Sequence, residues 1–194
     1  MSKASARSAI LDATKRLLWE RGFEATSPRD VLDASGAGQG SLYHHFPGKL
    51  ALGVAALEEI AAEEVAAMDA IFDPALPPLK RVRAYLERKR DPLKGCRLAR
   101  MANEAAIEQP EFRRPIAAYL ERIETHLRTS LEEAGAGGEL KAGADPAVLA
   151  AALLAIVEGG FVLARAHWDG ERMVRAVDGG LALLDGFTAA ETSR

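Results

Sequence analysis

Residues 26–49 read Thr-Ser-Pro-Arg-Asp-Val-Leu-Asp-Ala-Ser-Gly-Ala-Gly-Gln-Gly-Ser-Leu-Tyr-His-His-Phe-Pro-Gly-Lys, and this pattern predicts two short helices joined by a sharp corner. Ser27 is a good N-cap for the first helix, and Pro28 suits its first position. Asp30 stands where it completes a capping box with Ser27. Because glycine readily takes the left-handed conformation that ends a helix, we expect the first helix to end at Gly36.

The second short helix, expected over 39–45, has one apolar and one polar side. Leu42 and Phe46 are its large apolar residues, which we expect to face the core. The opposite side carries small and polar residues, which suit a helix that enters the major groove of DNA. Gly38, just before this helix, offers no side chain to cap it. The two segments together predict a helix-turn-helix.

The rest of the chain predicts helices as well. No run of four or more valine, isoleucine, threonine or aromatic residues alternates with polar ones, so the pattern that predicts a β-strand is nearly absent. Apolar residues recur at three- and four-residue spacing, and all nine prolines fit helix boundaries or first turns. We predict an all-α protein with a three-helix unit over 1–48 and a helical bundle over 49–194. The nine expected helices lie at about 4–21, 28–35, 39–45, 49–72, 79–90, 96–108, 111–134, 146–168 and 171–188.

Composition excludes several classes of protein. Of the 194 residues, 48% are hydrophobic and 27% are charged, which is typical of a globular chain rather than a disordered one. A single cysteine excludes a disulfide framework and a multi-cysteine zinc site. The most apolar stretch, 146–164, contains Glu158, so we interpret it as a buried helix rather than a membrane span. The first residues lead into a charged helix and not into a signal peptide. We expect a cytoplasmic protein with no membrane partner.

Charge is distributed unevenly along the chain. Residues 1–50 hold seven Lys/Arg and five Asp/Glu, although the whole chain has a net charge of -3. This difference favours an anionic partner for the N-terminal end. Residues 80–100 hold nine Lys/Arg and two acids. That segment is either an anion-attracting face or, as is commoner for charge runs, a solvated surface. In the second case it would be partly paired with the acidic residues Glu58, Glu59, Glu63 and Glu64.

The N-terminal region resembles the TetR/AcrR family of bacterial transcriptional regulators. The resemblance covers residues 10–57 and rests on Trp19-Glu-Arg-Gly-Phe-Glu-Ala-Thr26 and on Gly40-Ser-Leu-Tyr-His-His-Phe46. The His-His-Phe-Pro-Gly stretch, with Gly95-Cys96 later, is more similar to the LmrA/YxaF-type subgroup. The resemblance implies a homodimeric DNA-binding regulator that is not an enzyme, most simply a repressor released from its operator by a small molecule. A ligand-independent regulator, an activator, or a helical small-molecule-binding protein with a vestigial helix-turn-helix are the alternatives.

The resemblance also implies residues that contact a palindromic operator. Thr26 and the helix start at Ser27 would hold phosphate through hydroxyl and backbone N–H groups. Gln39 would bond a base with two hydrogen bonds, preferably adenine. Other positions would contact base edges or phosphate oxygens. The full implied set is Thr26, Ser27, Gln39, Gly40, Ser41, Tyr43, His44 and Lys49.

Two further surfaces follow from the resemblance. A pocket for a small hydrophobic or aromatic ligand is expected in the C-terminal domain, and apolar residues of the last two helices are expected to form a dimer interface. For the second set, burial within one chain is the alternative. The pocket candidates are Met68, Phe72, Met101, Glu104, Tyr119, Ile123, His126 and Phe161. The interface candidates are Leu153, Leu154, Val157, Val177, Leu181 and Leu184.

Metal, cofactor and redox sites have weak support in the sequence. His44 and His45 are adjacent, so they point to different sides of a helix, and no third ligand is near. No nucleotide-binding or nucleophile motif is present. Cys96 lies between Lys94 and Arg97, which favours a lowered pKa and redox activity, but a lone small buried thiol is the commoner outcome. We expect no metal and no cofactor.

Overall fold

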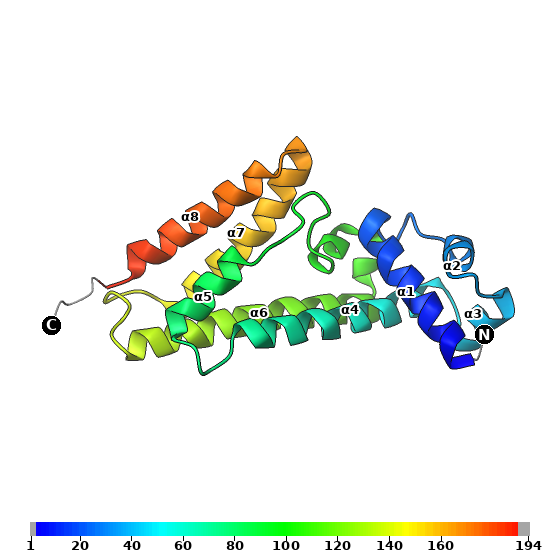
Figure 1. Cartoon of the computed structure of the whole chain (residues 1–194), viewed down its shortest axis with the longest axis horizontal. Helices are drawn as coiled ribbons and strands as arrows, with labels where there is room; N and C mark the ends of the chain where they lie inside the picture. The colour runs from blue at the N-terminus through cyan, green and yellow to red at the C-terminus, as the bar shows by residue number, and fades with distance from the viewer. Residues whose placement is uncertain (1–2, 190–194) are drawn as a thin grey trace. The chain divides into compact units, whose positions relative to one another are not determined.

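The computed structural model describes residues 3–189, and over this range the chain forms eight α-helices and two short 3₁₀ helices (Figure 1). The all-α class is therefore confirmed. The helices are α1 (Lys3–Arg21), α2 (Pro28–Ser35), α3 (Gln39–His45), α4 (Lys49–Ile71), α5 (Pro78–Glu87), η1 (Ala99–Asn103), η2 (Ala105–Glu108), α6 (Pro110–Ala136), α7 (Pro146–His167) and α8 (Glu171–Phe187).

The described residues form two compact units. Unit 1 contains residues 3–64 and 97–119, and unit 2 contains residues 65–96 and 120–189. The boundaries fall inside α4 and α6, so each of these helices belongs partly to both units. Compactness therefore does not divide the chain at residue 48. A functional division at that residue stays a prediction.

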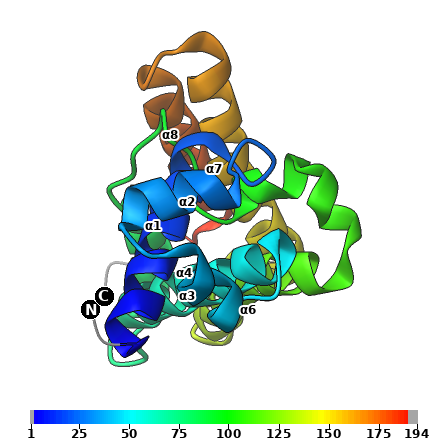
Figure 2. The same cartoon turned by 90° about the vertical axis from the view of Figure 1, so that its right-hand side faces the viewer.

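Unit 1 is built around the apolar faces of α1, α3 and α4, and Figure 2 shows α1, α2 and α3 together in blue and cyan. Leu42 and Phe46 are buried, as their spacing predicts, and they anchor α3. Between α2 and α3 the chain turns at Gly36, whose φ of 66° is left-handed. The predicted corner is confirmed. At Gly53 a Cβ would lie 2.5 Å from the ring of Phe23, so glycine lets α4 approach this ring closely.

Unit 2 contains α7 and α8, which run side by side in opposite directions (Figure 1). Small residues allow this close approach: a Cβ at Gly160 would lie 2.6 Å from the sulfur of Met173. The corner between the two helices falls at Trp168, which has a left-handed φ of 51° and ends α7. By length and composition α7 is apolar enough to cross a membrane. The core helices of soluble proteins pass the same test, so a single helix of this kind is weak evidence for a membrane span.

The predicted helix over 96–108 is wrong in one respect, because the segment forms η1 and η2 instead of one α-helix. Glu104 separates the two 3₁₀ helices and has extended backbone angles, with φ of -82° and ψ of 146°. Contacts with residues far away in the sequence explain the break. The carboxylate of Glu104 accepts hydrogen bonds from the backbone of Phe23 and Glu24, and the guanidinium of Arg100 donates to the carbonyl of Trp19. These contacts outweigh the helical propensity of the segment.

Candidate functional site

The exposed face of α3 is the centre of the candidate site. Gln39 and Gly40 are exposed at its start, and Ser41 is half-buried. Nothing lies within 4 Å of the position that a Cβ would take at Gly40. The side opposite the buried Leu42 is therefore open, and it is the side that carries the predicted base-reading residues. The start of α3 has no side-chain cap, as Gly38 predicts.

Two predicted phosphate-binding residues also lie on this exposed surface. Tyr43 is 50% exposed although it is a large aromatic residue, and His44 is exposed beside it. The rings of His44 and His45 meet edge to face, with centroids 5.0 Å apart. A phenolic hydroxyl and an imidazole on one surface supply hydrogen-bond donors for phosphate oxygens.

The start of α2 is fixed by the predicted capping box. The Ser27 hydroxyl donates to Asp30 at 2.6 Å and accepts from the backbone N–H of Asp30 at 3.2 Å. The backbone N–H of Ser27 donates to the same carboxylate at 2.8 Å. These hydrogen bonds from Ser27, with Arg21 nearby at 3.3 Å, hold the pKa of Asp30 below its ordinary value. Both donors of Ser27 thus serve the cap, and its phosphate contact stays a prediction.

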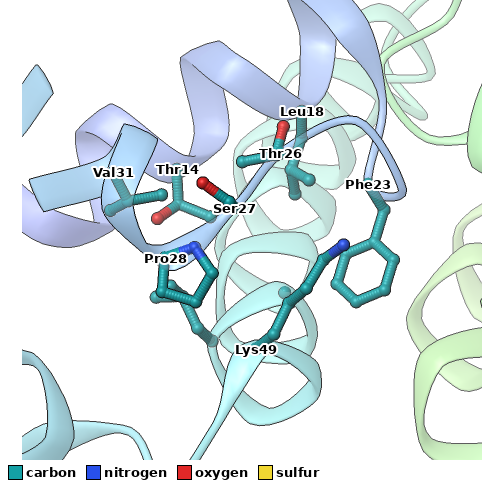
Figure 3. Close-up of a pocket in the computed structure, with 10 residues that line it drawn as sticks. Thr14, Leu18, Phe23, Thr26, Ser27, Pro28, Val31 and Lys49 are labelled. Carbon is teal, nitrogen blue, oxygen red and sulfur yellow. The ribbon is translucent and has the colours of Figure 1, made fainter. Parts of the chain in front are cut away.

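The hydroxyl of Thr26, a predicted phosphate contact, is bonded within the chain. Thr26 is 4% exposed, and its hydroxyl donates to the carbonyl of Gly22 at 2.7 Å. Figure 3 shows Thr26 among the residues that line a pocket between α1, α2 and α4. This pocket has a volume of only about 10 Å³, so it has room for a single water at most. The hydroxyl therefore stabilises the turn before α2.

Arg29 is a candidate phosphate contact that sequence reasoning missed. Its side chain is 92% exposed at the start of α2, and its nearest acidic partner, Asp33, is 4.0 Å away. A cation at this place can bind a phosphate at little cost in stability, because an exposed ion pair such as that with Asp33 contributes little to the free energy of folding. The signal in the sequence is an arginine in the first turn of α2, the first helix of the helix-turn-helix.

Lys49 occupies a more enclosed place than the resemblance implies. Its ammonium group donates to the carbonyl of Glu24 at 3.1 Å and lies 4.6 Å from the centre of the Phe23 ring (Figure 3). The carboxylate of Glu24 is 3.9 Å away. An ammonium has three donors, so the carbonyl of Glu24 leaves donors for phosphate. The phosphate contact of Lys49 stays a prediction.

Glu104 is misassigned as a pocket residue. It lies in unit 1, where its two carboxylate oxygens accept hydrogen bonds from the N–H groups of Phe23 at 3.1 Å and Glu24 at 2.9 Å. Both oxygens thus serve the turn between α1 and α2. No local pattern could reveal this contact, because about 80 residues separate the partners in the sequence.

The acidic residues on α4 take part in ion pairs within unit 1. Lys15 contacts Glu63 at 2.8 Å and Glu59 at 3.2 Å. Burial opposes the charge of Lys15, but these hydrogen bonds and one to Asp12 raise its pKa overall. Arg97 contacts Glu63 at 2.9 Å and Glu64 at 3.2 Å. For Arg97, the predicted pairing of the basic segment with the acidic helix face is confirmed.

The remaining pocket candidates are divided between the two units. Met68, Phe72 and Ile123 are buried in unit 2, while Met101 and Tyr119 are buried in unit 1. The structure brings Phe72 together with His126, whose rings stack, and Phe161 in unit 2 is half-buried. As a pocket, the set stays a prediction.

Unit 2 also holds a polar cluster around Glu158, Cys96, Arg90 and Tyr85. Burial raises the pKa of Glu158 to about 7, although a hydrogen bond from the Cys96 thiol and the charge of Arg90 lower it. Arg90 donates to the carbonyls of Leu86 and Arg88 and lies 5.1 Å from the ring centre of Tyr85. Burial raises the pKa of Tyr85 as well. A half-buried carboxyl that titrates near neutrality is typical of functional sites.

Over residues 3–189, no three His, Cys, Asp or Glu side chains gather in a way that suits a metal ion.

Four predicted interface residues belong instead to the core of the chain. Leu153, Leu154, Val157 and Leu184 are all buried, with Leu154 the most exposed at 9%. For these four, the alternative of burial within one chain is correct, because they pack between α7, α8 and their neighbours in unit 2. Val177 and Leu181 are half-buried.

A different row of small apolar residues is exposed on α7. Val148, Ala151, Ala155 and Val162 recur at helical spacing on one face, and all are exposed. Gly159 lies in the same row, with open space around its Cβ position. We call these five residues the α7 stripe. Val174 on α8 and Trp168 at the corner are exposed large apolar residues in the same unit. Exposed apolar residues that share one helix face make the α7 stripe a candidate association surface.

Comparison with known proteins supports a helix-turn-helix in which α3 is the exposed recognition helix and α2 the capped supporting helix. The family model of the bacterial regulatory proteins of the tetR family matches residues 10–57, and that of the tetracyclin repressor-like C-terminal domain matches residues 78–179. The chain belongs to the TetR family of transcriptional regulators. Regulators of this family are non-enzymatic, soluble DNA-binding proteins that form dimers and bind small-molecule ligands.

Individual relatives support the same assignment. The transcriptional regulator AcuR of Cereibacter sphaeroides is 28% identical over 167 residues, which are 82% of this chain and 76% of AcuR. The regulator LmrA of Bacillus subtilis is 39% identical over 80 residues, 39% of this chain and 43% of LmrA. The crystal structure of a regulatory protein TetR from Rhodobacter sphaeroides has a TM-score of 0.79 and 26% identity, covering 90% of this chain and 96% of that one.

Proposed function

We propose that the protein is a homodimeric repressor that binds a palindromic operator and leaves it when a small molecule binds to unit 2. The observation that carries the proposal is the open polar face of α3 above the buried Leu42 and Phe46. A helix whose apolar side is packed against the core, and whose opposite side carries small and polar residues, suits insertion into a major groove. Such a protein acts where the DNA is, so we also propose a cytoplasmic location.

In this proposal the residues of unit 1 divide their roles. Gln39 reads one base pair, preferably through adenine, with Gly40 and Ser41 beside it at the base edges. Tyr43 and His44 bond phosphate oxygens on one side of the groove. Lys49 adds a point charge, and we add Arg29 to the phosphate contacts because of its exposure. Phosphate contacts fix the position of the helix, and base contacts determine the sequence preference.

The α7 stripe supports dimerisation. Its small residues let a second copy of α7 approach closely, and its exposed valines offer apolar surface to bury. A two-fold symmetric dimer places two copies of α3 on half-sites about one helical turn, roughly 34–36 Å, apart or at a multiple of that distance. The stripe thus fits the palindromic operator that the proposal requires.

The ligand is proposed to be hydrophobic or aromatic. Met68, Phe72 and Ile123 supply apolar surface in unit 2, while His126 and Glu158 are half-buried polar groups in the same unit that can orient a ligand. α4 is one continuous helix that begins at Lys49 and carries Met68 near its other end. A ligand that prefers one tilt of α4 would change the separation of the two recognition helices and so weaken operator binding.

The test is a gel shift with purified full-length protein and genomic fragments that flank its own gene. We expect one fragment to shift at nanomolar protein while an unrelated fragment of equal length does not. The bound site is then placed before a promoter in an in vitro transcription assay, where a repressor lowers the transcript. A transcript that rises instead contradicts repression, and the absence of any selectively shifted fragment contradicts sequence-specific binding.

A further inference from the structure

The turn between α1 and α2 is held by side chains from two distant parts of the chain. The N–H of Glu24 donates to Glu104 at 2.9 Å, and the carbonyl of the same residue accepts from Lys49 at 3.1 Å. The N–H of Phe23 donates to the other oxygen of Glu104 at 3.1 Å. The backbone polar groups of Phe23 and Glu24 are thus bonded to charged side chains, which form stronger hydrogen bonds than neutral ones.

The fit around Glu104 is close. Gly22 has a left-handed φ of 90°, and a Cβ at this position would lie 2.1 Å from the Glu104 carboxylate. Only glycine therefore allows both the turn and the approach of the carboxylate. The turn lies immediately before Thr26 and Ser27, and Ser27 caps the start of α2. A shift of the turn therefore moves the start of the helix-turn-helix.

Glu104 is one of three residues through which a single segment of unit 1 contacts other parts of the same unit. We call residues 97–104 the strap. At its beginning Arg97 lies 5.8 Å from the ring centre of Trp19 and pairs with Glu63 on α4. In its middle Arg100 donates to the carbonyl of Trp19. At its end Glu104 holds the turn. The strap thus contacts the last turn of α1, the α1–α2 turn and α4.

We propose that Glu104 is a positioning residue for DNA binding, which fixes the start of the helix-turn-helix through Phe23 and Glu24. Its position is outside the stretch that matches the DNA-binding family model, which ends at residue 57. The strap follows Cys96, the last residue of the first segment of unit 2, without a break. It therefore ties the start of the helix-turn-helix to the chain that leaves unit 2. The inference rests on the proposed DNA-binding function.

The test compares Glu104→Gln with Glu108→Gln, a matched control on the exposed side of η2. Glutamine keeps the size but has one acceptor oxygen, so its amide nitrogen faces an N–H donor. We expect Glu104→Gln to bind the operator about tenfold more weakly, with a smaller loss on non-specific DNA, so that the specificity ratio falls. Glu108→Gln should bind as the wild type does.

Hydrogen exchange of the Phe23 and Glu24 amides supplies a second readout, which should accelerate in Glu104→Gln only. If Glu104→Gln fails to fold, Glu104→Asp replaces it, because aspartate keeps the charge but is too short to reach both amides. Operator affinity and a specificity ratio equal to the wild type, in whichever variant folds, overturn the proposal. So does a uniform loss on all DNA without faster exchange at these two amides. A wild type that selects no operator would instead contradict the proposed function.

Discussion

The imidazole ring of His126 lies flat on the ring of Phe72, with centroids 4.8 Å apart and an interplanar angle of 2°. His126 Nε2 is also 2.7 Å from Asp69 Oδ1, which accepts a second hydrogen bond from Arg122 at 2.9 Å. Asp69 lies in the last turn of α4, whereas Arg122 and His126 lie on α6. One carboxylate and one stacked pair therefore join the end of α4 to α6 within unit 2.

The first prediction concerns Asp69. Hydrogen bonds from Arg122 and His126 hold the pKa of Asp69 below its ordinary value. A lowered folded-state pKa stabilises the protein above the unfolded-state pKa of about 3.9, and this contribution is lost as the pH falls below that value. Because the group is exposed, we expect Asp69→Asn to lower the free energy of unfolding at neutral pH by less than about 1 kcal/mol.

Urea unfolding measures this effect, with Glu124→Gln on the exposed side of α6 as the control. The difference between wild type and Asp69→Asn should shrink as the pH is lowered through the acid range. A difference that is independent of pH would show that the charge of Asp69 does not stabilise the contact.

The second prediction concerns Glu158, whose pKa is raised to about 7 chiefly by burial. Between the unfolded-state pKa, about 4.3, and pH 7 the folded protein binds more protons than the unfolded chain, so stability falls as the pH rises through this window. Glu158→Gln removes the titration and keeps an acceptor oxygen for the Cys96 thiol. We expect the variant to be more stable than the wild type at pH 8, by roughly 1–3 kcal/mol, and to lose the pH dependence over this window.

Thermal unfolding at pH 5 and pH 8 tests this prediction. Equal slopes of stability against pH in the two proteins would mean that Glu158 titrates normally.

The third prediction separates base reading from phosphate binding on α3. We expect Gln39→Ala to relax the preference at one base pair of each half-site, at a cost of about 1–3 kcal/mol for the preferred base. Tyr43→Phe keeps the ring and removes the hydroxyl, so it should weaken binding to all sequences alike. Selection from a randomised operator library compares the two. An unchanged sequence preference in Gln39→Ala would show that Gln39 does not read a base.

The fourth prediction concerns Arg29 at the start of α2. A lysine or arginine that neutralises one phosphate adds about 1 to the slope of log affinity against log salt. We expect Arg29→Ala to reduce this slope by about that amount, and to leave the free energy of unfolding within roughly 0.5 kcal/mol of the wild type. Arg128→Ala is the matched control, because Arg128 also pairs with an acid four residues later, at 3.8 Å.

A salt slope that falls equally in both arginine variants would indicate a general effect of net charge and not a phosphate contact.

The fifth prediction concerns the α7 stripe. Ala155→Glu places a charge in the middle of the proposed interface, where pairing would bury it without a partner. We expect a folded monomer at micromolar concentration, seen by light scattering and by unchanged helical circular dichroism. Thr129→Glu, at an exposed site on α6, should remain a dimer. A dimeric Ala155→Glu variant would place the interface elsewhere. Leu154→Glu should unfold the chain instead, because Leu154 is in the core.

The helix-turn-helix was predictable because its signals are local. The capping box of Ser27 and Asp30 and the left-handed Gly36 act within a few residues of each other, so the sequence shows them directly. The burial of Leu42 and Phe46 follows from their spacing on one short helix. The confirmed part of the site is therefore its scaffold.

The helix expected over 96–108 failed because of contact over a long distance in the chain. Glu104 interrupts it, and its carboxylate holds the backbone of Phe23 and Glu24, about 80 residues away in the sequence. The inward turn of Thr26 is local, since its hydroxyl bonds the carbonyl of Gly22 four residues earlier. The burial of four expected interface residues has a different reason. Apolar residues surround α7 on all sides, so their periodicity does not tell which side faces the core, as the burial of Leu154 shows.

The open space at Gly40 has a consequence for how such a protein changes during evolution. A Cβ introduced there meets no neighbour within 4 Å. Replacing a glycine inside a helix by alanine also stabilises that helix by roughly 0.5–1 kcal/mol. A small side chain at this position therefore fits the fold. Under the proposed base contact of α3, duplicated copies of the gene would acquire new operators one substitution at a time, starting at residue 40.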